Sequence, residues 1–167
     1  MKKFKHLIIL FFLLNTSNSL ATPKVSIIFI KGSEFTDFLL TEQSKANSLN
    51  ILKKQFTKLF ETISVQYLTK DSFLEVAILD IDLPGKIVSQ PGIMGHNMRY
   101  SSDVRYIKLD FVYILKNAEG KILSQGPVRL EHRTKRHKIK RNFLDWKHTD
   151  LYKKRLNKWF EQTFSNK

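Results

Sequence analysis

Apolar residues along this chain fall into runs and stripes that predict four strands and two helices. Two runs are nearly continuous, as in strands that lie inside a sheet. The segment 106–115 alternates apolar and polar residues, and two segments show helical spacing. The segment 122–130 is the returning strand of a hairpin, and its interruption by Gly126-Pro127 predicts a bulge or an edge position. In chain order, the pattern predicts a strand over 25–30, a helix over 41–63, strands over 73–83, 106–115 and 122–130, and a helix over 149–164.

The stretch Phe73–Gly85 is the expected centre of the domain, because it is apolar on both faces before it ends in Pro-Gly. Strict alternation would place Leu74, Val76 and Ile78 on one face, together with Asp80 and Asp82. The nearly continuous apolarity of the first two strands suggests that both are interior.

The order of elements defines the fold class. It is strand, helix, strand, strand, strand, helix, with one crossover helix and one hairpin turn at 117–120. We therefore expect an α+β domain with a mixed four-stranded sheet and two helices packed on one face. Residues 86–104 have no period, so we expect a long irregular loop there that is either functional or merely mobile.

The N-terminus has the pattern of a signal peptide. A basic segment with Lys2, Lys3 and Lys5 precedes the apolar run 7–14, and Ser19-Leu-Ala21 is a small-x-small cleavage site. Eight apolar residues are too few to span a bilayer, which needs roughly 20. We therefore expect residues 1–21 to be removed and residues 22–167 to form a single domain, exported to the periplasm or secreted.

Composition narrows the class of partner. The chain has a formal net charge of +14, which falls to +11 when the three lysines of the signal peptide are removed. It contains no cysteine, so neither disulfides nor an N-terminal lipid-modified cysteine are expected. So basic a protein favours anionic partners, although the charge could also serve solubility alone.

Several segments resemble an uncharacterised family of exported bacterial proteins, the domain of unknown function 3016. The matching residues are Phe35-Thr-Asp37, Asp80-Ile-Asp-Leu-Pro-Gly85, Asp103-Val-Arg105, Asp110-Phe-Val-Tyr113, Asn117-Ala-Glu-Gly120 and Leu151-Tyr-Lys-Lys-Arg-Leu-Asn-Lys-Trp-Phe160. The chain departs from the family pattern at Pro84 and Lys86, and its tract 131–141 is more basic. The resemblance implies export and a shared fold, and it implies no activity.

Asp80 and Asp82 are the weak candidates for a metal or catalytic site. Two carboxylates on one face at a strand end could bind Ca²⁺ or Mg²⁺, or act as an acid and base, and Asp37 and Asp103 could join them if the fold brings those loops close. The alternative is structural: the carboxylates accept backbone N–H groups of the following turn or pair with Arg105. We favour the structural interpretation.

Other catalytic signatures are missing from the sequence. It has no phosphate-binding glycine loop, no Gly-x-Ser-x-Gly motif and no cysteine nucleophile. The histidines form no metal motif, and His132 and His137 lie among cations, which predicts surface histidines. We therefore expect a non-catalytic protein without a cofactor, and an envelope enzyme or metal-binding protein that uses Asp80 and Asp82 is the alternative.

The segment Arg129–Arg141 is the clearest candidate binding element, since seven of its thirteen residues are Lys or Arg. For an exported protein, an anionic envelope lipid or polysaccharide suits such a tract better than nucleic acid, and a protein partner is a further alternative. The other interpretation is a solvated connector between the last strand and the last helix. The candidate anion-binding residues are Arg133, Lys135, Arg136, Lys138, Lys140 and Arg141.

Overall fold

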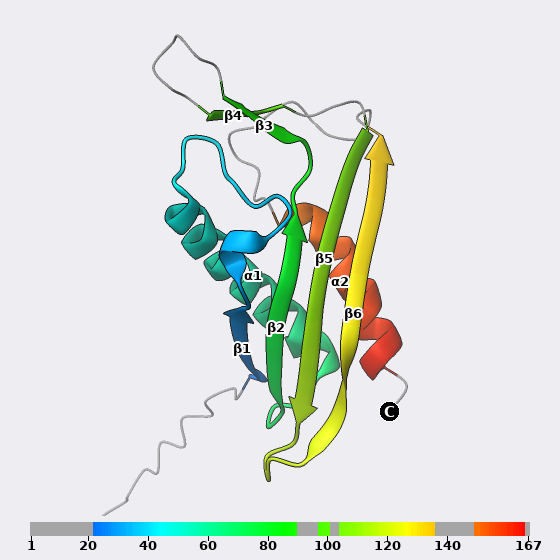
Figure 1. Cartoon of the computed structure of the whole chain (residues 1–167). Helices are drawn as coiled ribbons and strands as arrows, with labels where there is room; N and C mark the ends of the chain where they lie inside the picture. Colours follow the sequence, from blue (N-terminus) through cyan, green and yellow to red (C-terminus); the bar gives the residue numbers. More distant parts are fainter. Residues whose placement is uncertain (1–21, 90–96, 101–103, 136–148, 166–167) are drawn as a thin grey trace, which may run out of the picture.

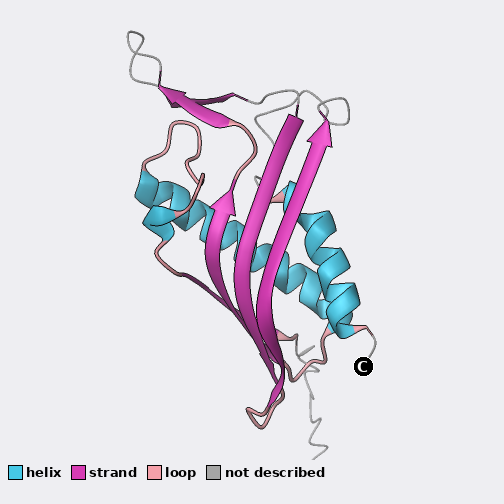
Figure 2. Cartoon of the chain, turned by 45° about the vertical axis from the view of Figure 1, so that its right-hand side comes forward, coloured by secondary structure: helices cyan, strands magenta, loops and turns pink. Residues whose placement is uncertain are grey.

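The protein is a single layer of sheet covered on one face by two helices, in a computed structural model that describes residues 22–89, 97–100, 104–135 and 149–165 (Figures 1 and 2). This is the α+β class that the sequence predicts. The strands are β1 (Lys24–Phe29), β2 (Phe73–Asp82), β3 (Lys86–Ser89), β4 (Asn97–Tyr100), β5 (Val104–Lys116) and β6 (Ile122–Lys135). The helices are the short 3₁₀ turn η1 (Gly32–Glu34), α1 (Lys45–Tyr67) and α2 (Asp150–Phe164).

The main sheet has the strand order β1-β2-β5-β6. β1 runs parallel to β2, while β2, β5 and β6 pair antiparallel, so the sheet is mixed as expected. The prediction that the first two strands are both interior is correct for β2 and wrong for β1, which forms an edge. The apolar run of β1 is misleading because Ile28 lies on the uncovered face, where it is 49% exposed.

Part of the stretch expected to be irregular is a second, smaller sheet. Residues Lys86–Ser89 pair antiparallel with Asn97–Tyr100. The prediction of an irregular stretch over 86–104 is therefore wrong for these two strands, and residues 90–96 and 101–103 lie outside the described part. Strands of four residues are too short to show a hydrophobic period.

β6 is longer than its apolar pattern suggests. The pattern predicts an end at Leu130, but the strand continues to Lys135, which pairs with Val104 of β5. The expectation of a connector is therefore wrong for residues 131–135. Backbone pairing with β5 sustains the strand, and an edge strand with one exposed face tolerates charged residues there. The turn before β6 is confirmed, with Gly120 at φ 79° and Lys121 N donating to Asn117 Oδ1 over 2.9 Å.

α1 covers Lys45–Tyr67, so it begins and ends four residues later than the predicted helix over 41–63. Ser44 is its N-cap, and its hydroxyl accepts a hydrogen bond from Asn47 N at 3.2 Å. The chain reverses just before this point, at Glu42 with φ 59°. α2 begins after Thr149 as predicted, although the Thr149 side chain makes no capping hydrogen bond. No helix in the described part of the chain is both long and apolar enough to cross a membrane.

The core lies between the helices and the sheet. Phe56 and Phe60 of α1, Phe111 of β5 and Phe160 of α2 are fully buried. Phe60 makes edge-to-face contacts with both Phe111 and Phe160, at centroid distances of 5.6 Å and 6.0 Å. These aromatic contacts fix α1 and α2 against the same strand.

No described helix other than the short η1 turn at its upper end lies on the opposite face of the sheet, which we call the open face (Figure 2). β2 is central but is not covered on both faces, since Leu79 is 44% exposed. A shallow depression of about 350 Å³ crosses this open face and is lined mainly by aliphatic side chains, among them Ile28, Ala77, Val112 and Ile114.

Candidate functional site

A β-bulge decides where the two candidate aspartates point. Ile78 pairs with Phe111 and Asp80 with Asp110, which leaves Leu79 as the extra residue in β2. The alternation shifts by one position, so Ile81 joins the core and is fully buried. The prediction that Asp80 and Asp82 share a face with Leu74, Val76 and Ile78 is therefore wrong. The bulge places both carboxylates on the open face instead, which avoids burying them in the core.

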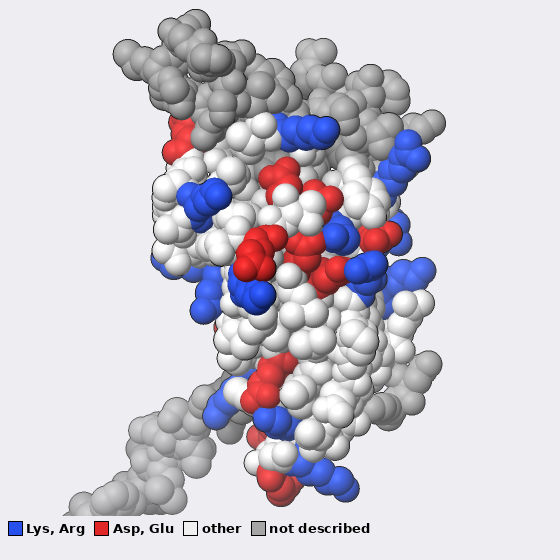
Figure 3. Space-filling view, in the orientation of Figure 1, with Lys and Arg blue, Asp and Glu red and all other residues white. Residues whose placement is uncertain are grey.

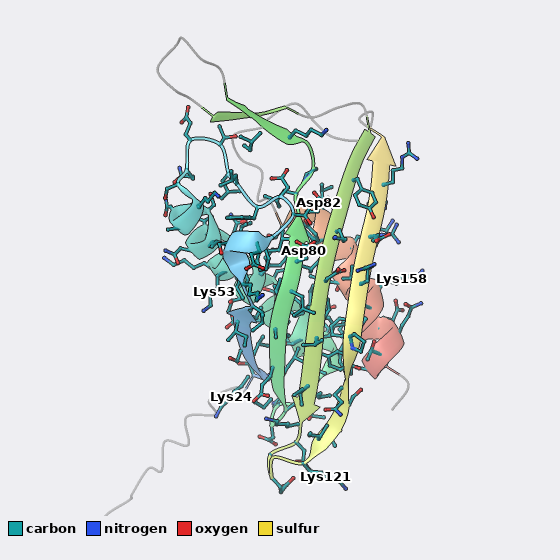
Figure 4. All side chains as sticks on the ribbon, in the orientation of Figure 1. Lys24, Lys53, Asp80, Asp82, Lys121 and Lys158 are labelled. Atoms are coloured by element: carbon teal, nitrogen blue, oxygen red, sulfur yellow. The ribbon has the colours of Figure 1, made fainter. Side chains whose placement is uncertain are left out.

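Asp80 is the centre of a compact polar cluster on that face, which we call the Asp80 node (Asp80, Thr36 and Lys108). Its Oδ1 accepts a hydrogen bond from Thr36 N, and its Oδ2 accepts one from Thr36 Oγ1, both at 2.7 Å. Lys108 Nζ lies 2.7 Å from Oδ2, and the two side chains are only 18% (Asp80) and 21% (Lys108) exposed. Figure 4 labels Asp80 near the upper end of β2, beside the 35–38 loop.

The neighbouring backbone reinforces the node. Asp37 forms an isolated parallel bridge with Asp82, in which Asp37 N donates to Ile81 O at 3.0 Å and Leu83 N donates to Asp37 O at 2.8 Å. Asp37 is thus close to Asp82, as the sequence left open, while Asp103 lies outside the described residues. On the other side of the sheet, Tyr152 of α2 donates its hydroxyl to Asp82 O at 2.8 Å.

The charge state of the node favours a structural role. Burial alone would raise the pKa of Asp80, but the hydrogen bonds from Lys108 and Thr36 outweigh it and hold that pKa below its usual value. The hydrogen bond to Asp80 raises the pKa of Lys108. Both groups are therefore charged near neutral pH, whereas a general acid or base works best with a pKa near the working pH. The partners of Asp80 are Thr36 and Lys108.

A metal role for these aspartates gains no further support from the geometry. Both oxygens of Asp80 are engaged by hydrogen-bond donors. Across the described ranges, no three or more His, Asp or Glu side chains are grouped so that they could hold a metal ion.

The candidate basic residues divide between the described and undescribed parts of the chain. Arg133 is exposed on the open face of β6, opposite Tyr106, and Lys135 is the last residue of that strand. The other four candidates, Arg136, Lys138, Lys140 and Arg141, lie outside the described residues. Arg129 is already paired, because its Nε and Nη2 donate to the two carboxylate oxygens of Asp110 at 2.9 Å and 2.8 Å.

The structure adds basic residues that the sequence did not single out. α2 packs against β5 and β6, and it carries Lys154, Arg155 and Lys158 outside its buried stripe. We define the basic edge as Arg133, Lys154, Arg155 and Lys158. Figure 3 shows Lys and Arg along the edge that β6 and α2 form, while acidic side chains gather over the upper part of the open face. The run Lys153-Lys154-Arg155 is visible in the sequence, but only the packing of α2 beside β6 joins it to the tract.

The structure also corrects the prediction for His132. It was expected to be a surface histidine, but it lies half-buried on the helix-covered side of β6, with its Nδ1 2.6 Å from Arg155 Nη2. Alternation along β6 gives the reason, since His132 pairs with the buried Ile107.

Comparison with known proteins decides the family. The sequence profile of a family described as protein of unknown function, DUF3016, matches residues 23–162. The chain belongs to this family. No curated protein matches the sequence. Among solved structures, the fold is similar to a minor lipoprotein from Acinetobacter baumannii, with 10% identity, a TM-score of 0.27, and coverage of 83% of this chain and 87% of that chain. A TM-score so low carries no inference about function.

Two of the segments that resemble DUF3016 lie in contact with each other in the fold. Phe35-Thr-Asp37 and Asp80–Gly85 are distant in sequence, but they meet in the Asp80 node and in the bridge between Asp37 and Asp82. A third such segment begins with Asp110, which binds Arg129 on the same open face. In this DUF3016 protein the first two motifs therefore hold the loop after β1 to the sheet, and Asp110 links β5 to β6.

Proposed function

We propose that this protein is an exported, non-catalytic module that binds an anionic component of the cell envelope. The observation that carries the proposal is the basic edge, whose Arg133 is also the first residue of the sequence tract 133–141. Arg133 is exposed on β6, and Lys154, Arg155 and Lys158 lie on the adjacent helix. The tract adds Lys135, Arg136, Lys138, Lys140 and Arg141 without an acidic residue among them.

Physical arguments favour an anionic surface as the partner. The formal charge of +11 after loss of the signal peptide would attract polyanions over roughly one Debye length, about 8 Å at physiological salt. Two acidic side chains of the open face contribute little repulsion, because Asp110 is paired with Arg129 and Asp80 with Lys108. Asp80 and Lys108 are both charged near neutral pH, which supports a binding role over an enzymatic one.

The test is salt-dependent binding to vesicles that contain anionic phospholipid or lipopolysaccharide. We expect the variant with Arg133, Lys135, Arg136 and Lys138 changed to Gln to lose at least about tenfold in affinity at low salt. Each Lys or Arg near an anionic membrane contributes about 1 kcal/mol, so four exceed the value of a tenfold change. The parent affinity should fall steeply as salt rises, and the variant should show a shallower dependence.

A matched control removes the same charge from another surface. Lys45, Lys53, Lys54 and Lys58 are all exposed on α1, so their replacement by Gln lowers the net charge equally. If both variants bind equally well or equally poorly, general basicity and not the tract accounts for the binding, and the proposal fails. Circular dichroism of both variants checks that the fold is intact.

Export itself predicts a defined mature N-terminus. We expect cleavage after Ala21, so that Thr22 becomes the first residue of a protein released with the soluble periplasmic fraction. The position suits the fold, because Pro23 is buried and Lys24 N already donates to Ser72 O at 3.0 Å. Intact-mass measurement of the released protein checks this, and an uncleaved Met1 form retained in the inner membrane would contradict it.

A further inference from the structure

The contact between His132 and Arg155 joins two groups that can both be positive. A guanidinium is always charged and can only donate hydrogen bonds, so Arg155 Nη2 must donate to an unprotonated Nδ1 across the 2.6 Å between them. His132 is therefore neutral in this geometry, with its proton on Nε2. Within the described part of the chain, His132 is the one hydrogen-bond partner of Arg155, so further donors of its planar fork are available.

The surroundings of His132 contain cations and no compensating carboxylate among the described side chains that act on it. From α2, Arg155 and Lys154 exert positive charge on the ring. From β5, its register partner is the apolar Ile107. Its sequence neighbour Glu131 lies on the opposite face of β6, where it interacts with Tyr106. Burial first, and then the charges of Arg155 and Lys154, lower the pKa of His132.

We propose that Arg155, His132 and Lys154 form a binding site for a phosphate group, in which His132 takes up a proton when the anion binds. This assignment rests on the proposed role of the protein as an anion binder, and it names the recognised group. An Arg fork fits a tetrahedral oxyanion with two parallel hydrogen bonds, and a Lys ammonium adds a point charge. The bound anion supplies the missing negative charge, so a protonated His132 becomes a third donor in place of an acceptor.

The linkage between anion binding and protonation of His132 has a definite sign. An anion next to the imidazole favours its charged form, so the pKa of His132 rises on binding. By reciprocity, affinity for the anion increases as pH falls and His132 becomes protonated. A site composed of Arg and Lys alone would bind a permanent dianion equally well throughout this range.

The experiment follows the ring protons of His132 by NMR in the full mature protein, with the signal assigned by its loss in His132→Gln. The pH is varied between about 5 and 8 with sodium sulfate, a dianion throughout, or with sodium chloride at equal ionic strength. We expect sulfate to raise the pKa of His132 by about one, and inorganic phosphate to do so as well. Arg155→Gln should abolish the rise, and the charge-matched control Lys53→Gln should leave it unchanged.

Three outcomes overturn the inference: an unchanged pKa of His132 in sulfate, the same rise in chloride, or a full rise in Arg155→Gln. Two parallel titrations, one with inorganic phosphate and one with phosphatidylglycerol vesicles, distinguish a soluble phosphate ligand from a membrane phospholipid. If phosphate shifts the pKa while the vesicles do not bind, the site stands for soluble phosphate compounds and the envelope role fails. If vesicles bind through the tract while His132 does not respond to either probe, the proposed function stands and this site is rejected.

Discussion

Replacing Phe60 with alanine is expected to lower the free energy of unfolding of the mature protein by about 3–5 kcal/mol. Phe60 is fully buried, and its ring lies edge-to-face with Phe111, Trp159 and Phe160 at centroid distances of 5.6, 6.4 and 6.0 Å. The substitution therefore removes one ring from the junction of α1, α2 and β5, and the rigid neighbours cannot close the cavity fully. Urea unfolding followed by tryptophan fluorescence measures the loss.

A second substitution on the same helix serves as the control. Val65 is 55% exposed, so Val65→Ala should change the free energy of unfolding by less than about 0.5 kcal/mol. Domains of this size have about 5–15 kcal/mol of stability in total, so the Phe60 variant should be close to unfolding in a marginal protein. Equal, small effects of both substitutions would show that α1 and α2 are not packed through Phe60.

Asp80→Asn is expected to lower the free energy of unfolding by about 1–3 kcal/mol near neutral pH. The substitution leaves Lys108, which is only 21% exposed, without its carboxylate, and it weakens two hydrogen bonds from Thr36. The loop that contains Thr36 should then be held less firmly to the end of β2, and urea unfolding measures the loss.

The pH dependence of this stability loss shows whether it comes from the charge of the Asp80 carboxylate or from its shape. Because the pKa of Asp80 is lowered in the folded state, its stabilising contribution is complete above the unfolded value of about 3.9 and is lost as pH falls through the folded value. The difference between parent and Asp80→Asn should therefore shrink in acid. Lys31→Gln is the control, since Lys31 and Glu34 are 73% and 67% exposed in their ion pair, so its loss should cost no more than about 1 kcal/mol. A loss that is constant with pH would contradict a role for the carboxylate charge.

The local spacing of apolar residues was sufficient to predict most of the main helices and strands. The apolar alternation of β5 and the helical stripe with Leu52, Phe56 and Phe60 predict their buried faces correctly, because a covered face must be apolar at the period of its backbone. The hairpin turn at Asn117–Gly120 is equally local, since it depends on a glycine at positive φ and on an Asn side chain. The family resemblance also followed from short motifs in their order.

The bulge at Leu79 could not be predicted from periodicity. Alternation assumes one residue for each pleat, and an inserted residue reverses the face of everything after it. Two arrangements compete for the end of β2. One buries Ile81, and the other buries Asp80 and Asp82. The core selects the first, because burying unpaired carboxylates costs far more than breaking one step of the ladder.

The sequence by itself determined the α+β class, the buried stripes, the basic tract and the signal-peptide pattern, since each depends on neighbours within one turn, strand or short run. Tertiary structure alone decided which charges meet. Thr36 reaches Asp80 across 44 positions, and Arg155 reaches His132 across 23. Such pairs depend on the order of strands in the sheet and on the strand beside which α2 packs. No periodicity records this information, because the partner of a polar side chain is set by how distant elements dock and not by its own sequence neighbours.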